Sequence, residues 1–113
     1  MIEFSEEKRD GVIILSVKGR LDAVAAPELR PTIEKLVADK QKRVVFDLYD
    51  LEMIDSSGVG AIVSLFKRLR TIGGDVKIAR LTKQPKEIFR LLRLDRAFDI
   101  YESLDAAIKK FKR

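Results

Sequence analysis

Hydrophobic positions divide the chain into segments that predict strands and helices in turn. β-branched residues fill the segment from Gly11 to Gly19, and a weaker strand precedes it near Ile2 to Glu6. We expect these two strands to pair as a hairpin. A further strand covers Arg43 to Leu48, which is apolar on both faces and therefore typical of the centre of a sheet.

Apolar residues at helical spacing predict four helices. The first starts at about Pro27 or Glu28 and ends near Asp39, because Pro31 costs no hydrogen bond only within a first turn. Pro85 opens the third helix, and Ser103 caps the fourth. The residues expected to face the core are Leu29, Ile33, Leu36 and Val37 in the first helix, Val59, Ile62, Val63, Phe66 and Leu69 in the second, Ile88, Leu91 and Leu92 in the third, and Leu104, Ala107, Ile108 and Phe111 in the fourth.

Two more alternating segments, at residues 75–79 and 98–101, complete the set of predicted strands. Because strands and helices alternate along the chain, the sequence predicts an α/β fold with a mostly parallel sheet and an antiparallel edge at the N-terminus. We expect a single domain over residues 1–113, with a small mixed sheet of four to five strands flanked by about four helices.

The composition removes several classes of chemistry. The chain has no cysteine and no histidine, so it offers no disulfide, no thiolate metal site and no imidazole for acid–base catalysis. We expect no metal and no cofactor. The start of the chain lacks the pattern of a signal peptide, and no apolar run approaches the roughly 20 residues that span a bilayer. We therefore expect a cytoplasmic protein without a membrane span.

Positive charge is concentrated in the second half of the chain. Residues 1–66 hold 9 Lys and Arg against 12 Asp and Glu, whereas residues 67–113 hold 14 against 6. Such a field suits a nucleotide or nucleic acid, an anionic membrane or an acidic protein. The basic residues fall mainly on the polar faces of predicted helices without interleaved aromatic residues, so we expect solvated faces and no direct DNA binding.

The segment from Asp55 to Gly60 connects the central strand to the second helix and carries the candidate chemistry. Asp55, Ser56 or Ser57 suits a helix cap, which contributes about 1 kcal/mol. The following Gly58-Val59-Gly60 has no long side chain, which leaves the turn accessible to a partner or a kinase. There is no phosphate-binding P-loop and no base for serine hydrolysis. The acids Asp47, Asp50 and Asp55 follow one strand and do not suit a metal pocket.

Four motifs follow one another along the chain, and they are Gly19-Arg20-Leu21-Asp22, Val44-Val45-Phe46-Asp47-Leu48, Met53-Ile54-Asp55-Ser56-Ser57-Gly58-Val59-Gly60 and Ile72-Gly73-Gly74-Asp75-Val76. With these motifs the chain resembles STAS domains, specifically the stand-alone anti-sigma factor antagonists. The resemblance covers nearly the whole chain.

The resemblance implies a regulatory binding protein and not an enzyme. Its partner would be an anti-sigma factor that is also a serine kinase, and binding would release a sigma factor. Ser56 would be the phosphorylation site that ends binding, and a serine phosphatase would reverse the modification. The implied partner surface consists of Asp22, Asp55, Ser56, Ser57, Gly58, Val59 and Gly60.

Two other functions stay open from the sequence. One is a STAS module of another pathway, such as lipid transport or a stress-signalling complex. The other is a nucleotide-binding or nucleic-acid-binding protein that uses the basic C-terminal half.

Overall fold

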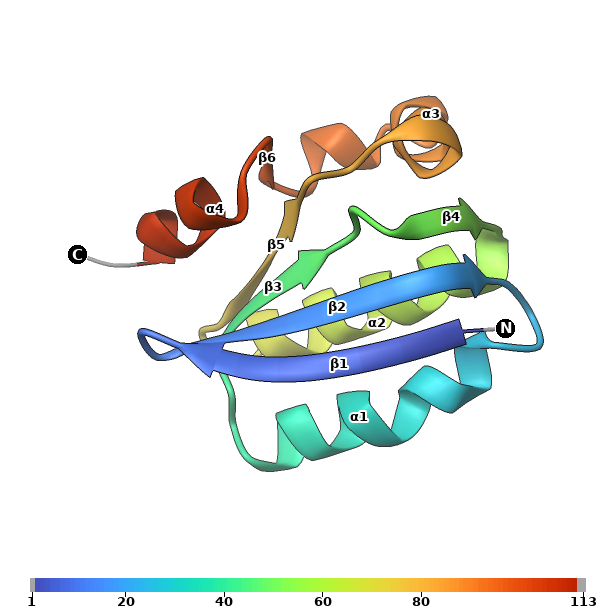
Figure 1. The fold of residues 1–113 in the computed structure, drawn as a ribbon. Coiled ribbons are helices and arrows are strands. Elements are labelled where there is room, and N and C mark those ends of the chain that lie inside the picture. The colour runs from blue at the N-terminus through green and yellow to red at the C-terminus, as the bar shows by residue number, and fades with distance from the viewer. Residues whose placement is uncertain (1, 112–113) are drawn as a thin grey trace.

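The computed structural model describes residues 2–111 as a sheet with helices on both faces (Figure 1). Strand order across the sheet is β1-β2-β3-β5-β6, and β4 pairs with the end of β2. The elements in chain order are β1 (Ile2–Arg9), β2 (Val12–Leu21), α1 (Ala26–Ala38), β3 (Arg43–Asp47), β4 (Leu51–Ile54), α2 (Ser56–Arg70), β5 (Asp75–Ala79), α3 (Lys83–Leu91), the 3-10 helix η1 (Leu94–Arg96), β6 (Ile100–Tyr101) and α4 (Leu104–Phe111).

The predicted hairpin and the predicted parallel sheet are both confirmed. β1 and β2 run antiparallel around a turn at Asp10 and Gly11, both of which have a positive φ, as a two-residue hairpin turn requires. All other strand pairs are parallel. The α/β class and the antiparallel N-terminal edge are therefore as the sequence predicts.

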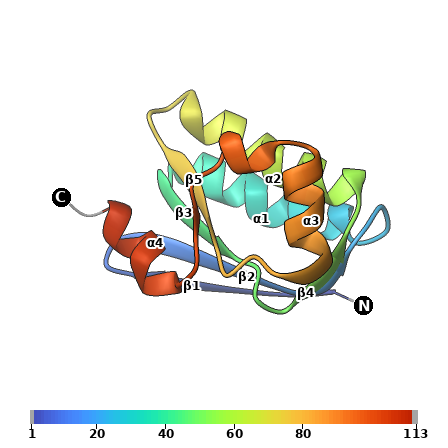
Figure 2. The ribbon, with the colours of Figure 1, turned by 90° about the horizontal axis from the view of Figure 1, so that it is seen from above.

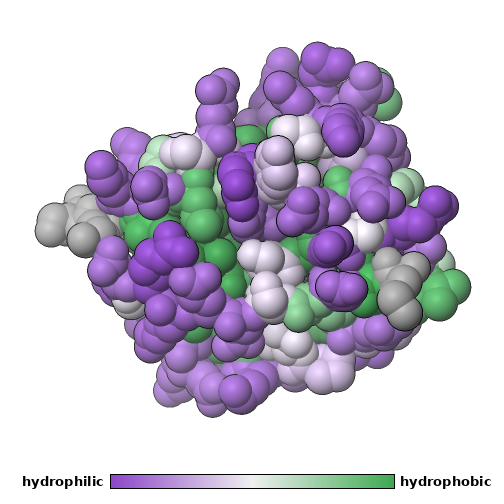
Figure 3. All heavy atoms as spheres, viewed as in Figure 1, coloured by the Kyte–Doolittle hydropathy of each residue, from purple (hydrophilic) through white to green (hydrophobic). Residues whose placement is uncertain are grey.

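The helices cover the two faces of the sheet unequally, as Figure 2 shows. α1, α2 and α3 lie over one face, where Phe46, Ile62 and Phe89 are fully buried in the larger core. α4 alone covers part of the other face, where Ala107 and Ile108 pack against Ile14 and Val45. Hydrophilic residues cover most of the molecular face that carries β1 and α4 (Figure 3).

The sheet has six strands among the described residues, one more than the sequence predicted. The additional strand is β4, which has four residues and pairs with β2 through an irregular register between Gly19 and Arg20. Leu51 and Ile54 are buried and Glu52 is exposed, so the segment lacks the strict alternation that predicts a strand.

Two helix starts differ from the expected ones. α1 begins at Ala26 and includes Pro31 as its sixth residue, so this proline lies beyond the first turn. Its missing N–H leaves the carbonyl of Pro27 without the usual intrahelical donor. α3 begins at Lys83, so Pro85 is its third residue and not its first. α2 begins at Ser56 and has Asp55 as its N-cap, one of the three caps considered from the sequence. The serines thus belong to the helix.

The inward positions of α3 were partly predicted wrongly. Leu91 and Leu92 are 74% and 53% exposed, whereas Pro85 and Phe89 are the buried residues of this helix. Leu91 lies two residues from Phe89 and so points away from the core, and Leu92 is the C-cap. In α2, Leu65 is fully buried, while Val63 and Phe66 are only partly so.

Candidate functional site

The turn that carries the candidate chemistry lies between β4 and α2, at the carboxyl ends of β2 and β4. Asp55 has an extended backbone, with φ −115° and ψ −172°, and its Oδ1 accepts a hydrogen bond from the N–H of Gly58 at 3.1 Å. This is the geometry of a helix N-cap. The capping role considered from the sequence therefore falls to Asp55, which leaves both serine hydroxyls uncommitted to it.

A second oxygen of Asp55 connects this turn to the loop after β2. Oδ2 accepts a hydrogen bond from the N–H of Ala23 at 3.1 Å, and the N–H of Asp55 donates to the carbonyl of Leu21 at 3.3 Å. One side chain therefore holds the loop before α1 and the first turn of α2 side by side.

Asp22 lies on that loop and organises its backbone. Its Oδ1 accepts hydrogen bonds from the N–H groups of Val24 at 3.1 Å and Ala25 at 3.0 Å. The bond from Ala25, with a smaller contribution from Val24, keeps the pKa of Asp22 below its ordinary value. Asp22 is thus near the serines, as the sequence predicted, but it also shapes the loop.

Ser56 and Ser57 are exposed at the start of α2. Among residues 2–111 no acceptor is found for the N–H groups of these two serines, which are two of the donors that any helix start leaves unpaired. The helix dipole adds a partial positive charge at the same place. The first turn therefore offers two accessible hydroxyls next to two free donors.

The two glycines of the turn have different structural roles. Gly58 is buried, and a Cβ at this position would lie 2.3 Å from the carbonyl oxygen of Leu21 and 2.7 Å from a side-chain carbon of Ile54. Gly60 is exposed and has open space around it. Val59 is 8% exposed and packs in the core. The close approach of β2 and α2 therefore requires Gly58, whereas no packing contact requires Gly60.

A groove between α1 and α2 starts at the exposed turn. Its volume is about 390 Å³, and Ser57 and Gly60 line it together with Arg30. At its other end, Arg68 donates two hydrogen bonds to Glu34, at 2.8 and 3.1 Å. The sequence did not indicate this groove, because the pairing of α1 with α2 brings together residues that are far apart along the chain.

Two further residues of the site, Gln84 and Val24, were not predicted from the sequence. Gln84 of α3 accepts a hydrogen bond from the N–H of Ile54 at 3.0 Å and donates to its carbonyl at 3.1 Å, which fixes β4 directly before Asp55. Val24 is 81% exposed on the loop that Asp22 and Asp55 hold. Gln84 is one of only two glutamines in the sequence, which is only a weak indication of a special role. A valine in a loop gives no indication of a functional role.

The other acids near the turn have a different role. Asp47 is 6% exposed and accepts two hydrogen bonds from Arg80, at 3.0 and 2.6 Å. Arg80 also lies 4.6 Å from the centre of the Tyr49 ring. Asp47 is therefore a buried ion-pair residue, and the described part of the chain holds no cluster of acids suited to a metal ion.

Fold and turn define a small α/β domain that presents hydroxyl groups at the start of a helix, and comparison with known proteins identifies its family. The sequence model of the STAS domain matches residues 3–107. The chain belongs to the STAS domain family. Among the described residues no helix is long and apolar enough to cross a membrane.

Its relatives are regulators. A putative anti-sigma factor antagonist of Bordetella bronchiseptica is 27% identical over 98% of this chain and 96% of its own length. An anti-sigma-F factor antagonist of Mycobacterium tuberculosis is 31% identical over 88% of this chain and 80% of its own length. These names describe regulatory binding proteins, which confirms the prediction that the chain is not an enzyme.

Solved structures confirm the fold. The crystal structure of an anti-sigma factor antagonist from Mycobacterium paratuberculosis superposes with a TM-score of 0.92 and 28% identity, over 100% of this chain and 96% of that one. A sulfate transporter family protein from Wolinella succinogenes has the same fold, with a TM-score of 0.77 and 14% identity, over 92% of this chain and 87% of that one. The fold by itself therefore does not fix the partner.

Proposed function

We infer that this protein is an anti-sigma factor antagonist of the cytoplasm, regulated by phosphorylation of Ser56. In the unphosphorylated state it binds an anti-sigma factor and so frees a sigma factor for transcription. The anti-sigma factor is a serine kinase that phosphorylates Ser56, and a serine phosphatase restores the binding form. The observation that carries the proposal is the exposed Ser56 hydroxyl, directly after an aspartate that already caps the helix.

The partner surface combines the loop of Asp22 with the first turn of α2. Asp55 holds the two segments together by its bonds to Ala23 and Gly58. Ser56, Ser57 and Gly60 supply the exposed part of the turn. Gly58 and Val59, which were predicted to contact the partner, are buried. We propose that they pack α2 beneath this surface. Their direct contact with a partner stays a prediction.

Val24 gives this surface an apolar contact. Val24 is 81% exposed beside the turn, so a partner that covers the turn would bury its side chain. Burial of the whole side chain is worth about 1.5 kcal/mol or more, so its loss weakens binding by roughly tenfold.

A phosphate on Ser56 changes the surface and leaves the fold intact. It carries a charge of roughly −1.5 to −2 at pH 7. The free N–H groups of Ser56 and Ser57 and the positive end of α2 accommodate that charge within the protein. A partner that packs on a small neutral hydroxyl would instead have to remove the phosphate from water, next to Asp55 and near Asp22.

Site mapping after incubation with the partner kinase and ATP tests the modification. We expect phosphate on Ser56 in the wild type and in Ser57→Ala, and no phosphate in Ser56→Ala. Phosphate that persists in Ser56→Ala and disappears in Ser57→Ala would assign the site to Ser57.

A pair of surface variants tests the location of the interface. Val24→Asp should prevent formation of a stoichiometric complex with the anti-sigma factor. Leu91→Asp is the matched control, because Leu91 is 74% exposed on α3 and lies outside the proposed surface. Equal loss of the complex in both variants, or in Leu91→Asp alone, would contradict this placement.

A further inference from the structure

A cleft larger than the groove between α1 and α2 lies at the end of the molecule away from Ser56. It has a volume of about 620 Å³ and lies where β2, β3 and β5 begin, whereas Ser56 lies where β2 and β4 end. α2 runs from one end to the other over 15 residues, or roughly 22 Å at the usual rise per residue. The cleft is therefore separate from the proposed partner surface.

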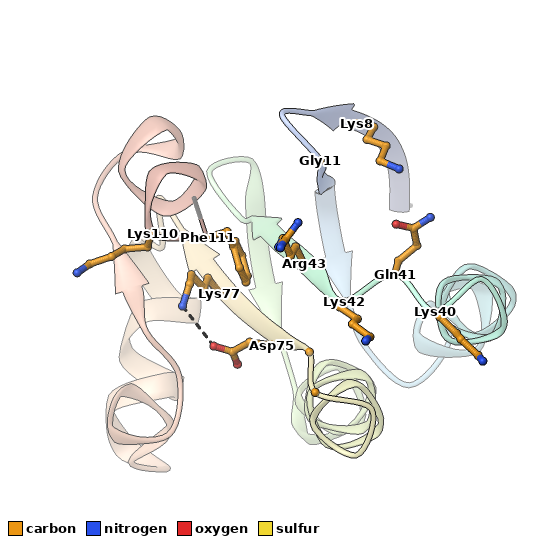
Figure 4. A pocket seen from close by; sticks show the side chains of 12 residues that line it. Lys8, Gly11, Lys40, Gln41, Lys42, Arg43, Asp75, Lys77, Lys110 and Phe111 are labelled. Atoms are coloured by element: carbon orange, nitrogen blue, oxygen red, sulfur yellow. Dashed lines mark hydrogen bonds and ion pairs between the residues drawn. The ribbon is translucent and has the colours of Figure 1, made fainter. Parts of the chain in front are cut away.

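Basic side chains line this cleft, as Figure 4 shows. Among the described residues of its lining, the only carboxylate is that of Asp75, which pairs with Lys77 at 3.2 Å and with Arg70 at 3.5 Å. Lys77 also pairs with Asp99 at 3.0 Å. The other five cations form no ion pair within the described residues, and they are Lys8, Lys40, Lys42, Arg43 and Lys110.

Helix ends account for only part of this charge. The C-termini of α1 and α2 lie at this end of the sheet, and each carries a partial charge of about −0.5. The last carbonyls also have donors, since Gln41 N–H bonds to Leu36 O at 3.0 Å and Gly74 N–H to Leu69 O at 2.8 Å. Five unpaired positive charges exceed what two capped helix ends require.

Lys40 occupies a backbone position that ordinarily favours glycine. Its φ is +54°, and its N–H bonds to Val37 O at 3.0 Å directly after α1. The residue after a helix in this left-handed conformation is usually glycine, because a Cβ is strained there. Lysine therefore places a positive charge in the cleft at some cost to the stability of the turn.

We propose that this cleft binds a small ligand that carries several linked phosphate groups. The cations come from separate parts of the fold: Lys8 from β1, Lys40 and Lys42 from the loop between α1 and β3, Arg43 from the start of β3 and Lys110 from α4. A single phosphate cannot reach all of them, whereas a chain of phosphates can extend along the cleft.

The size and donors of the cleft fit such a ligand. Its volume lies within the roughly 300–1,000 Å³ typical of small-molecule sites. The guanidinium of Arg43 can donate two parallel hydrogen bonds to one phosphate, and the lysines supply point charges for the others. Phe111 lies beside Lys77, whose Nζ is 4.7 Å from its ring centre, and adds an apolar wall.

Titration with inorganic tripolyphosphate, followed by the amide NMR signals, tests the proposal. We expect saturable shifts at residues 8–11, 40–43 and 73–77, with residues 54–60 unaffected. At equal ionic strength, orthophosphate should bind about tenfold more weakly, since it engages fewer of the cations. A comparison of ATP with tripolyphosphate distinguishes two sources of the ligand. Tighter binding of ATP than of tripolyphosphate identifies a nucleotide, and equal binding identifies the phosphate chain alone.

Two matched variants separate a local site from a general effect of charge. Lys40→Gly removes one cation from the cleft and relieves the left-handed backbone, so the affinity for tripolyphosphate should fall about fivefold while the melting temperature stays the same or rises. Arg93→Gly removes the same charge from a residue with φ +58°, and Arg93 does not line the cleft. Its affinity should stay within about twofold of the wild type.

Three results would overturn the proposal. They are the absence of saturable shifts with tripolyphosphate, an equal loss of affinity in Lys40→Gly and Arg93→Gly, and binding of duplex DNA without binding of tripolyphosphate. The outcome is independent of the anti-sigma factor, because none of these measurements uses it.

Discussion

The carboxylate of Asp55 accepts a hydrogen bond from the backbone N–H of Ala23 at 3.1 Å, across 32 residues of sequence. The same carboxylate caps α2 through Gly58. One side chain therefore holds both the loop before α1 and the turn that carries the exposed serines.

Asp55→Ala should destabilise the protein more than Asp55→Asn. Alanine removes both acceptors, and loss of the helix cap alone costs about 1 kcal/mol, with about 1 kcal/mol more for the bond to Ala23. Asparagine retains one acceptor for Gly58, so we expect about half of that loss. Urea denaturation measures both values, and equal free energies of unfolding for the two variants would show that the bond from Gly58 contributes nothing.

Alanine at Gly58 and at Gly60 should have opposite effects on stability. At Gly58 a Cβ would lie 2.3 Å from a backbone carbonyl oxygen, which forces β2 and α2 apart and costs about 2 kcal/mol or more. At Gly60 the space is open, so alanine should stabilise the helix by roughly 0.5–1 kcal/mol. Thermal denaturation distinguishes the two. A lower melting temperature of Gly60→Ala would show that the space around Gly60 is not open.

The Gly60→Ala variant also reports on the interface. If the partner contacts the exposed side of this turn, the added methyl group should weaken binding although the protein becomes more stable. Binding at wild-type affinity would place Gly60 outside the contact area.

The loop of Asp22 should respond to acid. The hydrogen bonds from Ala25 and Val24 lower the pKa of Asp22 below its ordinary value of 3.8, so the carboxylate is favoured in the folded state. The resulting stabilisation is present above pH 3.8 and is lost as the pH falls through the lowered value. In an NMR titration, the amide signals of Val24 and Ala25 should therefore move with a midpoint below 3.8. A midpoint at or above 3.8 would show that these bonds are not formed in solution.

Local sequence patterns predicted most of the fold, because periodic apolar residues encode each element separately. They predicted the hairpin, the parallel strands and the four helices. β4 was missed because its four residues lack alternation, and Leu91 was misplaced because the helical phase of α3 is set by Phe89. These features depend on neighbours that only the folded chain supplies.

The candidate site could be predicted less completely than the fold. The Asp-Ser-Ser-Gly turn was identified from its residues, since capping chemistry is local. The bond from Ala23, the support from Gln84 and the groove beside Arg30 depend on contacts across about 30 residues, so no local pattern signals them. The basic cleft likewise collects cations from separate parts of the chain, and four of the five cations that are unpaired within the described residues lie in residues 1–66, where acidic residues outnumber basic ones.

The central claim is that a negative charge on Ser56 excludes the partner and leaves the fold unchanged. Ser56→Glu places a charge at this position, and Ser5→Glu is the control with the same change of charge at an exposed serine of β1. The direct measurement is the affinity of each variant for the anti-sigma factor, with the melting temperature determined in parallel. We predict that Ser56→Glu weakens binding by about 100-fold or more at a near-wild-type melting temperature, while Ser5→Glu binds normally. Wild-type affinity of Ser56→Glu, or an equal loss in Ser5→Glu, would contradict the account.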